Sequence, residues 1–511
     1  GRAARRDKMA PARASALGSP GDYMIEKREI LAVAQQTSLT PHVVEKDYVL
    51  GWMLAGIYEH EELAESWIFK GGTCLKKCFF ETYRFSEDLD FTLTKPEHLD
   101  ADFLRRVFSE IGEWIYEETG IEIPAEKQEF DIYQNPRGQL SCQGKISYKG
   151  PVSSTHGLPR IKLDLTADER VVLPPVLAQI FHPYGDAPEE GIAVLAYDYI
   201  EAFAEKFRAL AERTRPRDLY DVVHLYRNGD ARPEPKRFMD VLRAKCEFKG
   251  ISVPRIADLE PHRADLEAGW IHMLEHQLPA LLPVATFWDA LPEIFAWLEG
   301  AIAQPLAPMP IGAGDTLIRE RIIAFPPGGQ GQSFVEMIRF AAANRLLVEI
   351  DYRDKQGNRS TRAIEAYSLQ RSQAGDVLLM AVRADNGQSR SYLVDSILGV
   401  KPTQTPFSPR YPIELTPSGL QSIPPTNSAG AYGGGGFGLR GTPPVRRSPI
   451  RRQPRSAGFE SMSGPTYVFK CSVCGKTFNK KSYDASLNKH KNNRTGYDCY
   501  GTFGTYVRTK Y

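Results

Sequence analysis

The 511-residue sequence contains no run of about 18 apolar residues, the length that a helix needs to span a bilayer. We therefore expect no transmembrane helix and no membrane partner. Residues 1–23 are rich in Ala, Arg, Pro and Gly and lack the apolar segment of a secretory signal. This stretch is interpreted as a disordered leader, with ordered structure beginning near Met24.

Cysteine is scarce, with seven residues, and the four at positions 74, 78, 142 and 246 show no spacing typical of a disulfide framework. This usage favours a reducing, cytoplasmic location. Net charge is also small at +1, but residues 421–511 hold 15 Lys or Arg against 3 Asp or Glu. A basic tail on an acidic body predicts nucleic-acid contact through the tail, the alternative being a tail that is merely solvated.

The strongest functional signal is the stretch 67–93, WIFKGGTCLKKCFFETYRFSEDLDFTL. A short apolar run ends at Gly71 and Gly72, and the following apolar residues have helical spacing. This pattern predicts a strand, a tight turn and a helix that starts at Thr73. Two glycines before a helix N-terminus suit a triphosphate, because backbone N–H groups can approach the anion closely.

Asp88 and Asp90 alternate with Leu89 and Phe91, so a strand would place both carboxylates on one face. Close carboxylates repel each other unless a cation compensates, and hard oxygen ligands favour Mg²⁺. We therefore expect Mg²⁺ to link this acidic pair to the phosphates of a nucleotide. The simpler alternative is a turn followed by a solvated strand.

Residues 161–166 also alternate, which would turn Asp164 to the same side as the first two aspartates. A third carboxylate from a neighbouring strand is what a two-metal or shared-metal phosphoryl-transfer site needs. The alternative is an acid that is simply exposed on a strand.

The order of these motifs resembles the nucleotidyltransferase fold, and GGTCLKK with RFSEDLDF is similar to the AbiEii/AbiGii toxin family. The VVEKDYVL, AEK and RDLYD segments resemble further parts of that family. The resemblance implies the catalytic residues Asp88, Asp90, Asp164, Lys206, Asp218 and Asp221. It implies the nucleotide-binding residues Gly71, Gly72, Thr73, Lys76, Arg84 and Ser86. A structural ion pair between Arg217 and Asp221, at i and i+4, is the alternative reading of that acid.

This resemblance spans residues 24–302 and implies Mg²⁺-dependent transfer of a nucleoside monophosphate from NTP to an acceptor. The acceptor is a tRNA 3′ end or a protein, in a bacterial toxin-antitoxin or phage-defence system with an antitoxin or regulatory protein as partner. The alternative is a non-enzymatic, nucleic-acid-binding regulator in which the transferase domain is inactive.

Residues 303–330 are interpreted as a linker, and 331–415 carry short alternating strands separated by tight turns, which predicts a small antiparallel barrel. The sequence of this segment resembles WYL domains, which are SH3-like barrels. Val377-Leu378-Leu379 occupies the position of the Trp-Tyr-Leu triplet after which those domains are named. The resemblance implies a basic ligand pocket around Arg383 and Arg390; a structural or partner-docking barrel is the alternative.

Residues 416–465 form a low-complexity, basic Gly/Pro/Arg linker. The final segment, 466–511, resembles a zinc finger of the Cys-Cys-His type and presents Cys471, Cys474, His490 and Cys499 as ligands for a structural Zn²⁺. Zinc modules bind either nucleic acids or proteins. The whole chain is thus expected to be an α+β protein with a nucleotidyltransferase-fold domain, a helical part after it, a small barrel and a zinc-stabilised module.

Overall fold

The computed structural model describes residues 25–415, apart from gaps at 38, 81–83, 153–156, 189, 229–230, 302–305 and 319–330. It also describes 466–471, 476–480, 487, 490–491, 498–499 and 504–510. The predicted leader and the low-complexity segment lie outside these residues. The chain divides into two units, 1–450 and 451–511, which are described separately.

A mixed seven-stranded sheet forms the centre of the first unit, in the order β3-β4-β5-β2-β1-β7-β6. Strands β2 and β5 run parallel, as do β1 and β7, and the other neighbours are antiparallel. The bounds are β1 Trp67–Lys70, β2 Asp88–Leu93, β3 Gln128–Gln134, β4 Leu140–Ser147, β5 Arg160–Thr166, β6 Val176–Gln179 and β7 Ala193–Ala196. The strands predicted before Gly71, around Asp88 and Asp90, and at 161–166 are confirmed as β1, β2 and β5.

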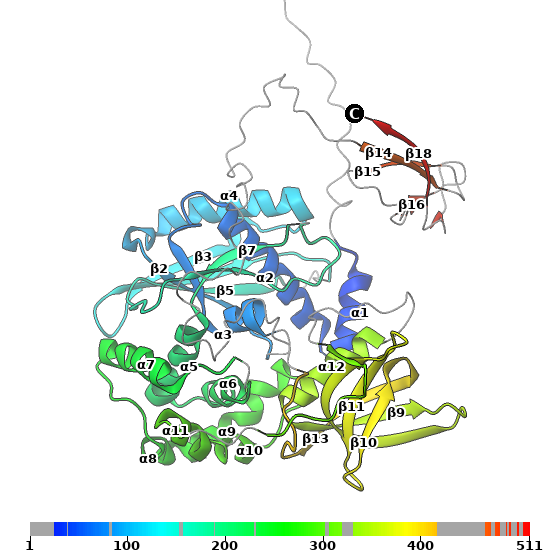
Figure 1. Cartoon of the computed structure of the whole chain (residues 1–511). Coiled ribbons are helices and arrows are strands. Elements are labelled where there is room, and N and C mark those ends of the chain that lie inside the picture. Colours follow the sequence, from blue (N-terminus) through cyan, green and yellow to red (C-terminus); the bar gives the residue numbers. More distant parts are fainter. Residues whose placement is uncertain are drawn as a thin grey trace, which may run out of the picture. The chain divides into compact units, whose positions relative to one another are not determined.

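Helices α1 (Lys27–Thr37), α2 (Pro41–Glu59) and α4 (Ala101–Thr119) accompany this sheet, with α4 along one face (Figure 1). The side chain of Asp100 accepts hydrogen bonds at the start of α4, and Gly120 ends that helix in the left-handed conformation. The core between sheet and helix contains fully buried aromatic side chains, including Trp67, Phe91 and Phe108. Burial of these rings fixes the outward face of β2 and therefore the direction of its aspartates.

A helical region follows on the other side of the sheet from α4 (Figure 1). Its helices are α5 Tyr199–Arg213, α6 Pro216–Arg227, α7 Pro235–Lys249, α8 Ile256–Leu259, α9 Arg263–Leu274, α10 Val284–Trp288 and α11 Leu291–Leu298. The chain breaks between α5 and α6, because Thr214 takes a left-handed conformation and Pro216 begins α6. The tryptophans of this region, Trp270, Trp288 and Trp297, are core residues.

Residues 331–415 form helix α12 and an antiparallel sheet in the order β12-β11-β10-β9-β13. The elements are α12 Gly331–Ala343, β9 Leu346–Arg353, β10 Arg359–Arg371, β11 Val377–Arg383, β12 Ser389–Leu393 and β13 Ile397–Pro406. A single 3₁₀ turn separates β12 from β13, which returns to pair with β9. Within the predicted linker, β8 (Thr316–Ile318) pairs with β10, so this part of the linker belongs to the sheet.

The second unit contains a three-stranded antiparallel sheet, β15-β14-β18, and a two-stranded ribbon, β16-β17. The bounds are β14 Thr466–Cys471, β15 Thr477–Lys480, β16 His490–Lys491, β17 Asp498–Cys499 and β18 Gly504–Lys510.

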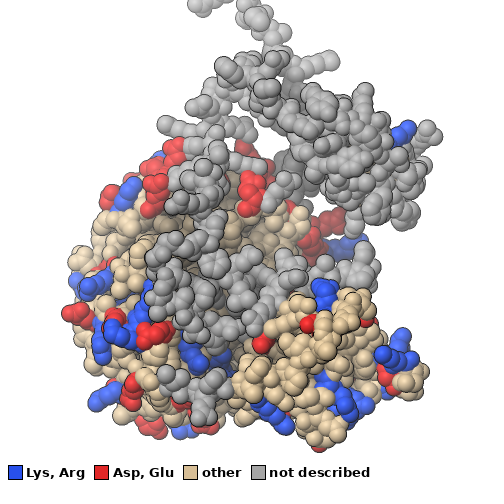
Figure 2. Space-filling model, in the orientation of Figure 1, with Lys and Arg blue, Asp and Glu red and all other residues tan. Residues whose placement is uncertain are grey.

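On the face of the first unit that Figure 2 shows, acidic and basic side chains are both spread over the described surface. Among the helices that the structure describes, none combines the length and the apolar composition needed to cross a membrane.

Candidate active site

Three aspartates lie on two neighbouring strands, β2 and β5, at the centre of the seven-stranded sheet. Asp90 on β2 lies opposite Asp164 on the parallel strand β5, and opposite Lys70 on the antiparallel strand β1. Asp88 is two residues before Asp90 on the same strand and therefore faces the same side. The prediction that the three carboxylates share one face of the sheet is confirmed.

The three carboxylates influence one another electrostatically. Burial raises the pKa of Asp90 to about 6, and the negative charge of Asp164 adds to the rise, while Lys70 and Lys206 oppose it. Burial likewise raises the pKa of Asp164; Lys70 opposes this effect and Asp88 strengthens it. The excess of negative charge in this group is the condition that a bound cation relieves.

The chemistry of these oxygen donors suits Mg²⁺, which commonly uses one or two carboxylates together with substrate phosphates. In the part of the chain that the structure describes, no three His, Cys, Asp or Glu side chains converge closely enough to hold a metal ion by themselves. A divalent cation held by a pair of these carboxylates would need further oxygen ligands, such as those of water or substrate phosphates.

The glycine motif lies directly beside the acidic group. Gly71 has φ of +79°, and a Cβ atom added there would be 2.0 Å from Oδ2 of Asp90. Gly72 faces Arg84 and Ser86, with its hypothetical Cβ 3.0 Å from a guanidinium nitrogen and 3.0 Å from the serine hydroxyl. Glycine is therefore required at position 71 both for its backbone conformation and for the space taken by Asp90.

The helix after this motif differs from the prediction. It begins at Gly71 instead of Thr73, and α3 (Gly71–Cys74) continues after four residues as a five-residue π-helix, η2 (Leu75–Phe79). The positive φ of Gly71 lets the chain turn immediately after β1, so the helical segment starts earlier. So short a helical segment contributes mainly its first backbone N–H groups to an anion site.

Two residues predicted to bind the nucleotide have other partners. The Thr73 hydroxyl donates a hydrogen bond to the backbone oxygen of Asp88 and so ties the glycine motif to β2. Lys76 is buried, with its ammonium 4.5 Å from the centre of the Phe85 ring. Their roles in phosphate binding stay predictions.

Asp221 is the centre of a buried ion-pair network. Its carboxylate accepts hydrogen bonds from Arg84 Nε at 2.7 Å and from the Arg84 terminal nitrogen at 2.8 Å, and Lys206 Nζ lies 2.8 Å away. Burial alone would raise the pKa of Asp221, but the charges of Arg84 and Lys206 hold it well below its usual range. The alternative prediction paired Asp221 with Arg217. In the structure the partners of Asp221 are Arg84 and Lys206 instead.

Asp218 belongs to a separate pair. Its two carboxylate oxygens accept hydrogen bonds of 2.9 Å each from Arg213 at the end of α5. The positive charge of Arg213 also lowers the pKa of Asp164, which places this arginine near the acidic group.

Sequence reasoning did not single out Lys70 or Arg213 as site residues. Lys70 is the last residue of β1, and its charge lowers the pKa of both Asp90 and Asp164. Its position directly before Gly71-Gly72 was a signal that could have identified it. For Arg213, the only signal was its place five residues before Asp218, and that spacing leads to a contact only because the helix breaks between them.

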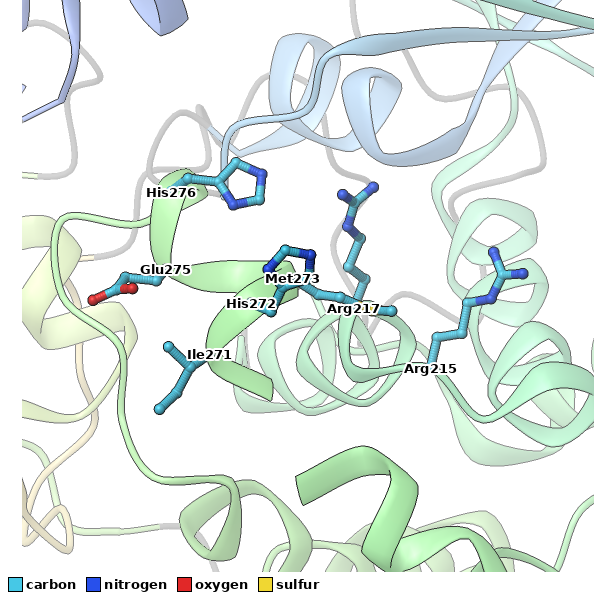
Figure 3. A pocket seen from close by; sticks show the side chains of 7 residues that line it. All are labelled: Arg215, Arg217, Ile271, His272, Met273, Glu275 and His276. Carbon is cyan, nitrogen blue, oxygen red and sulfur yellow. The ribbon is translucent and has the colours of Figure 1, made fainter. Parts of the chain in front are cut away.

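A cavity of roughly 690 Å³ adjoins the start of α6. Figure 3 shows the side chains of Arg217 and His276 extending toward the same space, with Arg215 beside them. The complete lining is Arg215, Arg217, Ile271, His272, Met273, Glu275 and His276. The lining thus contains two arginines and two histidines but only one glutamate, so the cavity is suited to an anion.

Arg217 connects this cavity with the acidic group. Burial and the neighbouring Arg84 cation lower the pKa of Arg217, whereas the charge of Asp88 opposes that effect. Its Nε atom is buried and has no hydrogen-bond partner among the described residues. Lys46, in the VVEKDYVL segment on α2, pairs with Glu87 at 2.7 Å.

Together, the strand-borne aspartates, the glycine motif and the lysine–arginine network define a nucleotidyltransferase, in agreement with a family match over residues 52–296. The matching family is described as "Nucleotidyl transferase AbiEii toxin, Type IV TA system". The match covers slightly under half of the chain. All six candidate catalytic residues, five aspartates and one lysine, lie within this segment.

Several solved structures are similar at low sequence identity. MenT4, a nucleotidyltransferase toxin from Mycobacterium tuberculosis H37Rv, is 17% identical with a TM-score of 0.33, covering 55% of this chain and 91% of that chain. JHP933 from Helicobacter pylori is 16% identical with a TM-score of 0.32, covering 51% and 95%. A putative nucleotidyltransferase from H. pylori is 17% identical with a TM-score of 0.31, covering 52% and 100%. None of the curated proteins matches this chain.

Proposed function

We propose that this nucleotidyltransferase transfers a nucleoside monophosphate from an NTP to a hydroxyl group of RNA, with Mg²⁺ held by Asp88 and Asp90. The acceptor oxygen attacks the α-phosphorus, the bond from that phosphorus to the bridging oxygen breaks, and pyrophosphate leaves. When bound, Mg²⁺ supplies charge neutralisation and polarisation of the phosphate oxygens. The observation that carries this proposal is the triad of mutually repelling carboxylates beside Gly71.

The residues of the site have different roles in the proposed transfer reaction. Asp164, whose pKa is raised by burial, is suited to accept the proton of the attacking hydroxyl. Lys206 is held by Asp221 beside Asp90 and stabilises charge on the transferring phosphate. Gly71, Gly72, Thr73, Lys76, Arg84 and Ser86 form the phosphate-binding side. Asp218 acts through Arg213, and Asp221 through Lys206 and Arg84.

The cavity at Arg215 and Arg217 favours RNA over protein as the acceptor. Its lining combines cationic groups with the apolar side chains of Ile271 and Met273, a combination that suits a phosphodiester backbone and the faces of bases. A tRNA 3′ end is a substrate of this chemistry. The family further suggests a toxin-antitoxin or phage-defence setting, with an antitoxin as partner.

Residues 331–415 are proposed to be a WYL-like, SH3-like barrel that binds an anionic ligand. The supporting observation is a group of three arginines around one tyrosine: Arg362, Arg383 and Arg390 all lower the pKa of Tyr392, which burial raises. Arg383 is already paired with Asp385 and Arg390 with Gln388, so a ligand would have to compete with these contacts.

For the second unit we propose the structural Zn²⁺ site at Cys471, Cys474, His490 and Cys499. Cys471 is buried, and the backbone positions of His490 and Cys499 lie opposite each other on β16 and β17. Cys474 lies outside the described residues.

The decisive experiment offers the purified full-length chain Mg²⁺ and each α-labelled NTP, with bulk tRNA or a cell protein extract as acceptor. Label that enters RNA, and does so only with Asp88 and Asp90 intact, supports the proposal. Label that enters protein keeps the transferase but rejects the RNA acceptor.

A further inference from the structure

A buried hydrogen bond joins the transferase domain to the part of the chain that follows it. The Tyr220 hydroxyl, on α6, donates to Oδ1 of Asn344 at 2.9 Å. Tyr220 is 1% exposed and Asn344 is 5% exposed, so water does not replace either partner easily. Asn344 lies between α12 and β9, well beyond residue 296, where the match to the transferase family ends.

The amide of Asn344 is held in a fixed orientation by its own helix. Its Nδ2 donates to the backbone oxygen of Phe340 at 2.9 Å, and its backbone N–H donates to the same oxygen at 3.1 Å. The next residue, Arg345, has φ of +56° and leads directly into β9, the strand that pairs with both β10 and β13. The position of Oδ1 therefore follows any movement of α12 or β9.

Tyr220 stands next in sequence to Asp221, whose carboxylate holds both Arg84 and Lys206. The Tyr220 ring also stacks on His224, with ring centres 5.7 Å apart, and His224 contacts Phe80 edge-on at 5.9 Å. Phe80 directly follows the π-helix of the glycine motif. A displacement of Tyr220 would thus affect the active site in two ways. It would shift Asp221 and the cations paired with it, and through His224 it would shift Phe80 beside the glycine motif.

We propose that Asn344 is a positioning residue for the transfer reaction. Through its hydrogen bond to Tyr220, the region 331–415 would control the activity of the transferase domain. With this bond made, α6 presents Asp221 in the place where it orders Lys206 and Arg84. When α12 moves, the support is lost and the two cations are no longer held at the phosphate site. The effect on activity rests on the proposed function above; the effect on local order does not.

The test compares variants in the full chain. Asn344→Leu removes the acceptor of this hydrogen bond, and Tyr220→Phe with Asn344→Leu removes both of its partners, which restores part of the stability. Tyr48→Phe is the matched control, because it removes another buried tyrosine hydroxyl bond, the one to Asp186 at 2.7 Å.

We expect kcat to fall at least about tenfold in Asn344→Leu and in the double variant, with the KM for NTP changed less than about threefold. Backbone amide exchange should accelerate in residues 84–90 and 216–227 in both, and in neither range for Tyr48→Phe. A double variant that recovers stability and kcat together would show a merely structural bond and overturn the proposal. Unchanged exchange in 84–90 would also overturn it, whether or not any acceptor is found. Absence of transfer by the unaltered protein would reject the proposed function alone, since the exchange comparison still decides the positioning role.

Discussion

Asp90 and Asp164 lie opposite each other on the parallel strands β2 and β5, and the charge of Asp164 helps to raise the pKa of Asp90 to about 6. A site that keeps two carboxylates in this relationship destabilises the metal-free protein. Lys70 and Lys206 offset part of this cost, and a bound cation would offset more of it, so stability, pH and metal binding would be linked at this point.

Asp90→Asn should therefore separate stability from activity. At neutral pH the neutral amide removes repulsion from a group whose folded pKa lies roughly two units above its ordinary value, which corresponds to about 1 to 3 kcal/mol of added stability without metal. Transfer should fall on the order of 100-fold or more, because the metal loses a ligand. Thermal unfolding in EDTA and labelled-NTP transfer measure the two effects; a less stable Asp90→Asn protein would contradict the electrostatic explanation.

Metal binding should weaken as the pH falls through about 6. The folded pKa of Asp90 is raised, so protons compete with the cation below that value, whereas above it the carboxylate is ionised. The same shift makes the metal-free protein lose stability as pH rises from about 4 to about 6, and Mn²⁺ or Mg²⁺ should restore it. Titration with Mn²⁺ at pH 5 and pH 7.5 checks the direction. Equal affinities at the two values would argue against Asp90 as a ligand.

Asp221→Asn should cost more stability than Asp218→Asn. The first change leaves two buried cations, Arg84 and Lys206, without their shared carboxylate, a loss expected to cost about 3 to 5 kcal/mol. The second leaves only Arg213, whose side chain is 47% exposed and can be solvated, at a cost of about 1 to 2 kcal/mol. Denaturant unfolding of the two variants provides the comparison, and equal losses would mean that Asp221 is not the centre of the network.

Arg217→Ala should raise the KM for an RNA acceptor about tenfold and leave the KM for NTP nearly unchanged. The reason is its place in the cavity beside the acidic group, where its charge would meet a phosphate of the acceptor. The dependence of RNA affinity on salt should also become weaker, by about one unit of slope. Arg105→Ala is a suitable control, because Arg105 lies on α4 and its side chain is 58% exposed in a surface pair with Asp102.

Removal of Zn²⁺ should affect the second unit alone. The segment 451–511 is a separate unit, and the proposed zinc module would depend on its metal for folding, because so short a segment buries little apolar surface. Cys474→Ser should abolish stoichiometric zinc binding, measured by metal analysis of the purified chain, while transferase activity on a small acceptor persists. Full zinc content in Cys474→Ser would remove this cysteine from the ligand set.

The sequence predicted the parts of this site that depend on local periodicity. Alternation in 88–93 and 161–166 correctly placed Asp88, Asp90 and Asp164 on one face, because burial of the intervening apolar residues leaves a strand only one orientation. The start of α6 at Pro216 obeys a local rule of the same kind, because proline fits the first turn of a helix and not its interior.

Contacts between distant segments were not predictable in this manner. The pairing of Asp221 with Arg84 joins residues 137 positions apart, and a nearer arginine at i−4 offered an equally good local partner. The early start of α3 depends on the space that Gly71 leaves for Asp90, which is visible only in the folded chain. Strand β8 likewise pairs with β10 from within a segment whose composition suggested only a linker.

The most direct test of the central claim is transfer of label from an α-labelled NTP to RNA by the full-length protein in Mg²⁺, measured beside Asp90→Asn. We predict labelled RNA with the unaltered protein, none above background with the variant, and release of pyrophosphate in equal amount. No transfer by the unaltered protein to either RNA or protein, together with intact RNA binding, would contradict the claim and favour a non-enzymatic, nucleic-acid-binding regulator.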